Sequence, residues 1–194
     1  IVKLLDIGKT VISKMTAEEV YNKSLIWAKE YDAELAKMLE DKEYALKVFG
    51  IERGNKKPRK DIAKWSEVKE NIEYMYDNKF YENTKEYPYQ VINDKESIEQ
   101  ILKLYIEKYF DENDDKQTWF DKIKELAVEM GYAKEVKEFK ANPDKYKAHV
   151  GDVSTVLRVA LTARTNTPDM YEIMNVFGKD RIQERFETAI KNLK

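Results

Sequence analysis

The apolar residues of this chain recur at intervals of three and four positions along most of its length. That spacing places them on one face of a helix, so the pattern predicts an all-α fold with little or no strand. The expected helices cover about 17–39, 42–49, 58–76, 97–109, 119–130, 152–163, 168–177 and 182–193. These stripes predict packed helices and carry no information about function.

Capping and breaking residues set the expected helix boundaries. Thr16 and Glu19 have the spacing of a capping box. Pro58 is expected to begin a helix, and Thr167 is expected to cap one whose first residue is Pro168, where the missing N–H costs nothing. The glycines expected to end helices are Gly50, Gly131 and Gly178.

Residues 78–96 differ from the helical stretches because aromatic, polar and proline residues follow one another there without a helical period. We interpret them as an extended connector between two packed helical subdomains. The expected parts of the chain are therefore a short, weakly patterned segment and two subdomains, with the ranges 1–16, 17–90 and 91–194.

The polar turn before residue 170 has chemistry suited to a nucleic-acid ligand. Backbone N–H groups at a helix start attract anions, and arginine side chains suit phosphates and base edges. Amide, hydroxyl, apolar and aromatic side chains beside them suit unstacked RNA bases. The candidate binding residues are Arg158, Arg164, Asn166, Thr167, Pro168, Met170 and Tyr171. On chemistry alone, a well-capped corner of a helical domain explains the same residues.

A second candidate lies in the basic loop 52–60, which contains Pro58. Residues 51–70 carry seven basic and four acidic side chains, although the whole chain has a net charge of −2. The candidate phosphate-binding residues are Arg53, Lys57, Arg59 and Lys60. A mobile lysine-rich surface loop explains them equally well. Two further arginines, Arg181 and Arg185, are expected on a solvated helix surface.

Composition excludes several classes of protein. The chain has 194 residues, no cysteine and one histidine, so a Cys/His zinc site and thiol chemistry are excluded. No metal site is predicted, because the acidic loop 111–115 lacks the glycine and distal glutamate of a calcium loop. No apolar run approaches the length that spans a membrane, which predicts no membrane partner. The absence of cysteine fits a reducing cytoplasm, which is the expected location. The first residue is Ile1, which suggests an excised piece of a longer protein.

An ordered series of residues near the end of the chain resembles one known family. The series consists of Leu157-Arg158-Val159-Ala160-Leu161-Thr162-Ala163-Arg164, Thr167-Pro168, Tyr171-Glu172-Ile173, Gly178-Lys179 and Arg185. It is similar to the end of bacterial glutamyl-tRNA synthetases. Residues 132–146 also resemble the connector that precedes this motif in one subgroup of the family. Many members have glycine where this chain has Ala163, so the helix is expected to continue further before it turns.

The resemblance implies a fold and a function. It implies the two helical subdomains of a class I synthetase anticodon-binding half, the α-helix cage, with residues 1–16 as the remnant of a connector to a catalytic half. The chain lacks the ATP-binding motifs of that half, so no catalytic residue and no cofactor are expected in it. ATP and Mg²⁺ would serve the parent ligase, whose partners would be tRNA for glutamate and its own N-terminal catalytic domain. The turn residues would contact anticodon bases.

Three alternatives stay open from the sequence. Residues 51–65 depart from the family pattern, so acceptance of tRNA for glutamine as a further partner is undecided. A helical protein-interaction module would show the same stripes without an RNA site. An independent helical enzyme would have to rely on carboxylates, which are spread over solvated faces.

Overall fold

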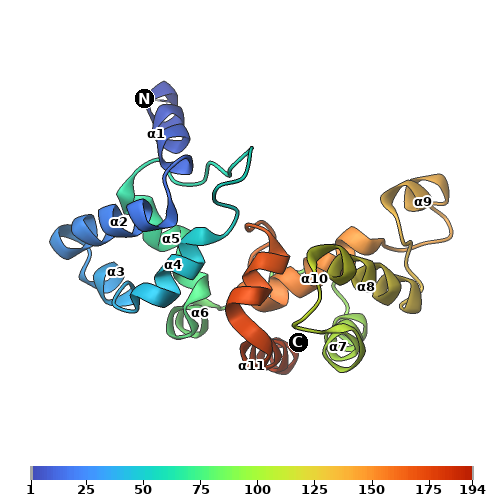
Figure 1. The fold of residues 1–194 in the computed structure, drawn as a ribbon. Helices are drawn as coiled ribbons and strands as arrows, with labels where there is room; N and C mark the ends of the chain where they lie inside the picture. The colour runs from blue at the N-terminus through green and yellow to red at the C-terminus, as the bar shows by residue number, and fades with distance from the viewer. Residues whose placement is uncertain (1, 194) are drawn as a thin grey trace. The chain divides into compact units, whose positions relative to one another are not determined.

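The computed structural model describes residues 2–193, which form two compact units that meet in sequence between Asn83 and Thr84. Eleven α-helices are present in this range, together with short 3₁₀ and π-helical segments (Figure 1). Extended pairing within residues 2–193 is limited to one isolated bridge between Ala133 and His149. The predicted all-α fold class is therefore confirmed.

The first unit packs short helices around α2. Its α-helices are α1 (Val2–Ser13), α2 (Ala17–Tyr31), α3 (Ala33–Met38), α4 (Lys42–Gly50), α5 (Val68–Ile72) and α6 (Asp77–Asn83). Two 3₁₀ segments flank α5, Trp65–Glu67 and Glu73–Met75. Helix α2 contacts both α3 and α4. The fully buried apolar side chains of these helices and their caps include Val20, Ala28, Leu35, Leu39 and Ala45.

The second unit is organised around α10. Its elements are α7 (Lys95–Leu104), a π-helical segment (Tyr105–Tyr109), α8 (Lys116–Glu129), α9 (Val136–Ala141), α10 (Val150–Thr162) and α11 (Met170–Lys191). Helix α10 contacts α7, α8 and α11. Most of its side chains are buried, among them Val153, Val156, Leu157, Val159, Ala160 and Leu161. A helix that is buried on nearly every side is the core of its unit.

Several helix boundaries differ from the sequence-based expectations. The expected helix 17–39 is broken at Asp32, whose side chain accepts hydrogen bonds from the backbone N–H groups of Glu34 and Leu35 and so begins α3. Residues 58–64 are not helical, so the prediction that Pro58 begins a helix is wrong. Residues 77–83 form α6, which leaves an extended connector of about 84–94. The weakly patterned start of the chain forms α1.

Other boundary predictions are confirmed. The capping box of α2 is formed, since Thr16 Oγ1 accepts from the Glu19 N–H and a Glu19 carboxylate oxygen accepts from the Thr16 N–H. Gly178 has φ 71° and ψ 169° and interrupts α11 at the expected place.

No helix within residues 2–193 is both long and apolar enough to span a lipid bilayer.

Arg185 is buried, which overturns the expectation that it lies on a solvated surface. Its side chain has 0% exposure, and Nη1 donates to the carbonyl oxygen of Leu161 at 2.6 Å. The guanidinium lies 4.2 Å from the centroid of the Phe177 ring. Leu161 belongs to the last turn of α10, where carbonyl groups lack helical partners and carry partial negative charge. A buried cation at this position stabilises the end of the central helix.

We predict that Arg185→Ala lowers the free energy of unfolding by about 3–5 kcal/mol, because a charge-assisted hydrogen bond and a desolvated cation–π contact are lost together. Arg185→Lys is expected to lose less, since the charge is kept while the planar guanidinium is not. The measurement is urea denaturation followed by circular dichroism. Arg181→Ala is the control, because Arg181 is partly exposed. An Arg185→Ala midpoint equal to that of the wild type would refute this account.

Candidate nucleic-acid interface

The turn between α10 and α11 begins at an alanine in the left-handed conformation. Ala163 has φ 52° and ψ 28°, and its N–H donates to the carbonyl oxygen of Val159 at 2.8 Å. The expectation that alanine would prolong the helix is therefore wrong. Thr162 Oγ1 accepts from the Arg164 N–H at 3.2 Å and donates to the Arg158 carbonyl oxygen at 2.7 Å. These hydrogen bonds hold Ala163 in the left-handed backbone conformation, which residues with a Cβ atom normally avoid.

Arg158 joins α10 to the far side of the turn. Its Nη1 donates to the carbonyl oxygens of Thr167, at 3.3 Å, and Pro168, at 3.1 Å, and also to Thr167 Oγ1. Thr167 is only 5% exposed. The guanidinium of Arg158 thus binds two backbone carbonyl groups of the turn, those of Thr167 and Pro168. This arrangement gives Arg158 and Thr167 a role in fixing the shape of the turn.

The start of α11 is capped by a carboxylate. The helix begins at Met170, and Asp169 Oδ1 accepts from the Glu172 N–H at 3.1 Å. The prediction that Thr167 is the cap and Pro168 the first helical residue is therefore wrong. Lys116 on α8 forms an ion pair with Asp169 at 2.6 Å. Because Asp169 supplies a negative charge at this end of the helix, the helix start itself is a poor site for a phosphate.

Tyr171 is held against α8 and the residues before it. Its hydroxyl group donates to the carbonyl oxygen of Asp114 at 2.8 Å, and its ring lies 5.8 Å from that of Trp119. Tyr171 is half-buried, while Met170 is only 4% exposed. The structure therefore leaves part of the Tyr171 ring open to a ligand and packs Met170 inside. The contacts of Tyr171 with Asp114 and Trp119 could not be predicted from the sequence of the turn, because both partners lie in a distant part of the chain.

The middle of the turn is the part that faces solvent. Thr165 and Asn166 are exposed, and Arg164 and Pro168 are partly exposed. The Asn166 side chain makes no hydrogen bond to another residue within the described range. The structure therefore brings the predicted residues together on one turn and separates them into exposed and internal members. Thr165 is an exposed residue of the turn that is not among the candidates predicted from the sequence.

His149 and the groups near it serve the start of α10. His149 Nδ1 accepts from the Gly151 N–H at 2.9 Å, and Asp152 Oδ2 accepts from the His149 N–H at 2.9 Å. No cluster of acidic or histidine side chains within residues 2–193 could hold a metal ion. The single histidine of the chain is therefore engaged in a helix cap.

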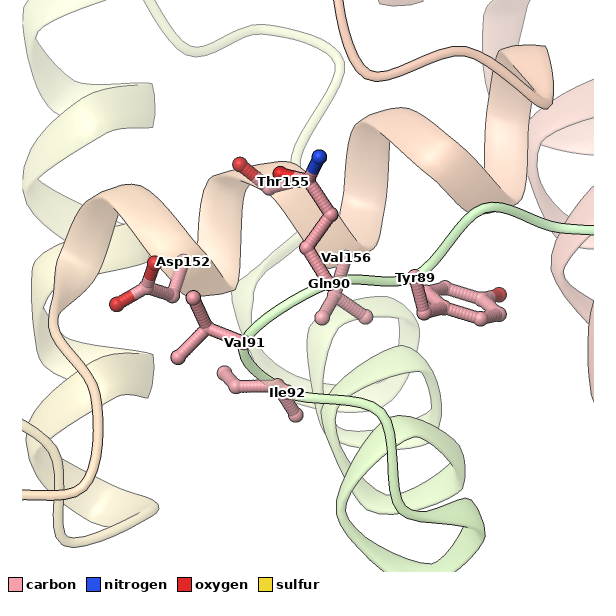
Figure 2. Close-up of a pocket in the computed structure, with 7 residues that line it drawn as sticks. All are labelled: Tyr89, Gln90, Val91, Ile92, Asp152, Thr155 and Val156. Atoms are coloured by element: carbon pink, nitrogen blue, oxygen red, sulfur yellow. The ribbon is translucent and has the colours of Figure 1, made fainter.

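A small hollow lies where the extended segment crosses α10. Figure 2 shows residues 89–92 running beside α10, with Asp152 and Thr155 projecting from the helix. Asp152 is engaged by the backbone of His149, and Thr155 Oγ1 donates to the Gly151 carbonyl oxygen at 2.9 Å. Since both polar groups already satisfy the first turn of the helix, this hollow is part of the packing of the unit.

The second candidate, the basic loop, also contains two internally engaged arginines. Arg53 Nε donates to the Phe49 carbonyl oxygen at 2.8 Å, and Nη1 donates to those of Ile12 and Met15 at 2.8 and 3.0 Å. Burial lowers the pKa of the Arg53 guanidinium. The hydrogen bond from Arg59 Nε to Asp61 Oδ2, at 2.7 Å, raises the pKa of Arg59. Both guanidiniums thus fix the loop, while Lys57 and Lys60 are exposed.

Comparison with known proteins identifies the class to which this all-α domain, with its exposed and internally braced turn, belongs. The family model described as "Anticodon binding domain" matches residues 33–190, so the chain belongs to the anticodon-binding domain family. The match includes the whole turn. No solved structure matches the chain.

The relatives have a common name. The chain is 44% identical to the glutamate–tRNA ligase of Acetivibrio thermocellus, over 97% of this chain and 34% of that protein. It is 46% identical to the glutamate–tRNA ligase of Clostridium perfringens strain SM101, over 96% of this chain and 34% of the relative. It is 42% identical to the glutamate–tRNA ligase of Sorangium cellulosum, over 95% of this chain and 32% of that protein. The chain thus spans about a third of the length of these relatives.

We predict that Ala163→Gly raises the free energy of unfolding by about 0.5–1 kcal/mol. Glycine adopts the left-handed conformation without the steric cost that alanine bears, and part of the gain is offset by the flexibility of glycine in the unfolded chain. Ala163→Val is the matched opposite, because a β-branched residue tolerates positive φ worst. Thermal and urea unfolding of both variants check this. Stabilisation by valine, or destabilisation by glycine, would contradict the prediction.

Proposed function

We propose that this chain reads the anticodon of a tRNA with the exposed face of the turn between α10 and α11. The observation that carries the proposal is the anticodon-binding family match over residues 33–190. Anticodon bases are unpaired and splayed, so their Watson–Crick edges and faces are open to side chains. An exposed, internally braced turn suits such a ligand, because little order has to be created on binding.

The residues of the turn divide into two roles in this proposal. Asn166 is exposed and carries an amide that can donate to and accept from one base edge. Tyr171 and Pro168 offer a partly exposed surface on which a base can stack, and Arg164 lies beside them. Arg158, Thr167 and Met170 act from inside, by holding the turn in shape. This division narrows the set of base contacts expected from the sequence.

The tRNA is proposed to be that for glutamate, as the names of the relatives suggest, with tRNA for glutamine as the open alternative. In a full-length ligase, attachment of glutamate with ATP and Mg²⁺ would belong to a catalytic part outside this sequence. The cytoplasmic location stays a prediction. A helical protein-interaction module is not favoured, since the family match specifies anticodon binding.

We also propose that helix α1 joins this domain to such a catalytic part. The two helical subdomains of the family are proposed to correspond to the two compact units of the chain. Three apolar side chains of α1, Leu4, Ile7 and Val11, are exposed by 71%, 54% and 51%. Their spacing of three and four residues places them on one side of the helix. An apolar stripe of this kind is suited to cover by another part of a longer chain.

The proposal is tested by titrating the chain with tRNA for glutamate, tRNA for glutamine and an anticodon-swapped tRNA at two salt concentrations. Binding is expected to weaken on the anticodon swap and to fall as salt rises. Equal binding of the first two tRNAs would identify a non-discriminating domain. Binding that ignores the anticodon, or no binding at low salt, would refute the proposal and favour the protein-interaction module.

Asn166→Ala is expected to weaken binding of the cognate tRNA by about 1–3 kcal/mol and to reduce the anticodon preference, as loss of a base-edge contact does. Helicity should not change, because Asn166 is exposed. Asn175→Ala, an exposed asparagine on α11, is the control and should bind as the wild type does. Equal binding by the Asn166 and Asn175 variants would remove Asn166 from the proposed site.

A further inference from the structure

The loop between α4 and the segment at Trp65 has a defined shape. Glu52 and Gly54 have positive φ angles of 54° and 83°, which fold the chain back directly after α4. Arg53 lies between them and donates to carbonyl oxygens from both α4 and the α1–α2 junction. Pro58 fixes its own φ angle and restricts the backbone of Lys57 before it. The loop is thus anchored at its base, although it contains no regular structure.

The acidic residues that flank the loop are drawn to one arginine. Arg59 Nε lies 2.7 Å from Asp61 Oδ2 and 3.7 Å from Glu52 Oε2. These two are the only carboxylates in residues 52–61, which contain five basic side chains and two acidic ones, an excess of three. The lysines that extend between them, Lys56, Lys57 and Lys60, are all exposed. No ion pair of these three lysines is recorded within residues 2–193.

Some of the lysines elsewhere in residues 2–193 are paired with an acidic neighbour. The lysines in recorded ion pairs include Lys42, Lys47, Lys69, Lys79, Lys103, Lys108, Lys116, Lys122 and Lys124. The chain as a whole is slightly acidic, with a net charge of −2. The positive loop is therefore a local exception to the charge pattern of the protein. The closely spaced exposed lysines of the loop suit a ligand that carries several negative charges in a row.

We propose that Lys56, Lys57 and Lys60 bind the phosphodiester backbone of the tRNA, with Arg53 and Arg59 as positioning residues. This inference rests on the proposed function, which supplies the RNA. Phosphate contacts add affinity and orientation without reading sequence, so this loop complements a turn that reads bases. Ammonium groups on an anchored loop release counterions from the RNA and give up little backbone freedom when they bind. The sequence-based set is thereby revised, with Lys56 added and the two arginines placed behind the lysines.

The test is a salt series of tRNA binding for the wild type and the variant Lys56→Ala/Lys57→Ala/Lys60→Ala. Removing three phosphate contacts is expected to reduce the slope of log affinity against log salt concentration by about 2. Binding at 0.1 M salt should weaken by roughly 10- to 100-fold. The ratio of affinities for the cognate and anticodon-swapped tRNAs should stay unchanged, since backbone contacts carry no sequence information.

The matched control is Lys23→Ala/Lys29→Ala/Lys37→Ala, which changes the net charge by the same amount at exposed lysines of α2 and α3. Circular dichroism checks that both variants are folded. An unchanged salt slope for the loop variant, or an equal change for the control, would overturn the inference and direct attention to a partner other than RNA. A changed slope combined with indifference to the anticodon would support this inference while refuting the proposed function. Absence of RNA binding by the wild type would overturn both.

Discussion

Burial of α10 on nearly every side places its last turn away from water, so the carbonyl groups of that turn must be satisfied by the protein itself. The charged hydrogen bond from Arg185 to Leu161 meets this need. Because Arg185 comes from the second half of α11, the same contact also ties the two helices together. The direction in which the chain leaves α10 depends on this packing.

The shape of the turn follows from that constraint. Ala163 accepts a left-handed conformation, and Arg158 gathers the carbonyl groups of Thr167 and Pro168 on the opposite side. Together these contacts leave Thr165 and Asn166 exposed and Arg164 partly exposed, while Thr167 is held inside. A rigid presentation of one or two polar side chains is what recognition of a splayed base requires, since ordering a flexible loop would reduce the affinity.

Charge is distributed differently at the start of α11 and in the loop 52–61. At the start of α11, Asp169 forms an ion pair with Lys116, so the negative charge of Asp169 and the positive charge of Lys116 balance each other. The loop of the first unit instead draws both of its flanking carboxylates to Arg59 and leaves three lysines exposed. A balanced surface suits base recognition by hydrogen bonds, whereas excess positive charge suits a phosphate backbone.

The sequence by itself determined the helical class, the position of most helices and the location of the turn, because apolar spacing, the capping box at Thr16 and the break at Gly178 are local properties. Its ordered motif near the end also pointed to the family. Tertiary structure decided which polar residues face solvent. Arg185 and Arg158 look like surface cations in sequence, yet each is directed at carbonyl groups of a distant residue, and such long-range partners leave no trace in local spacing.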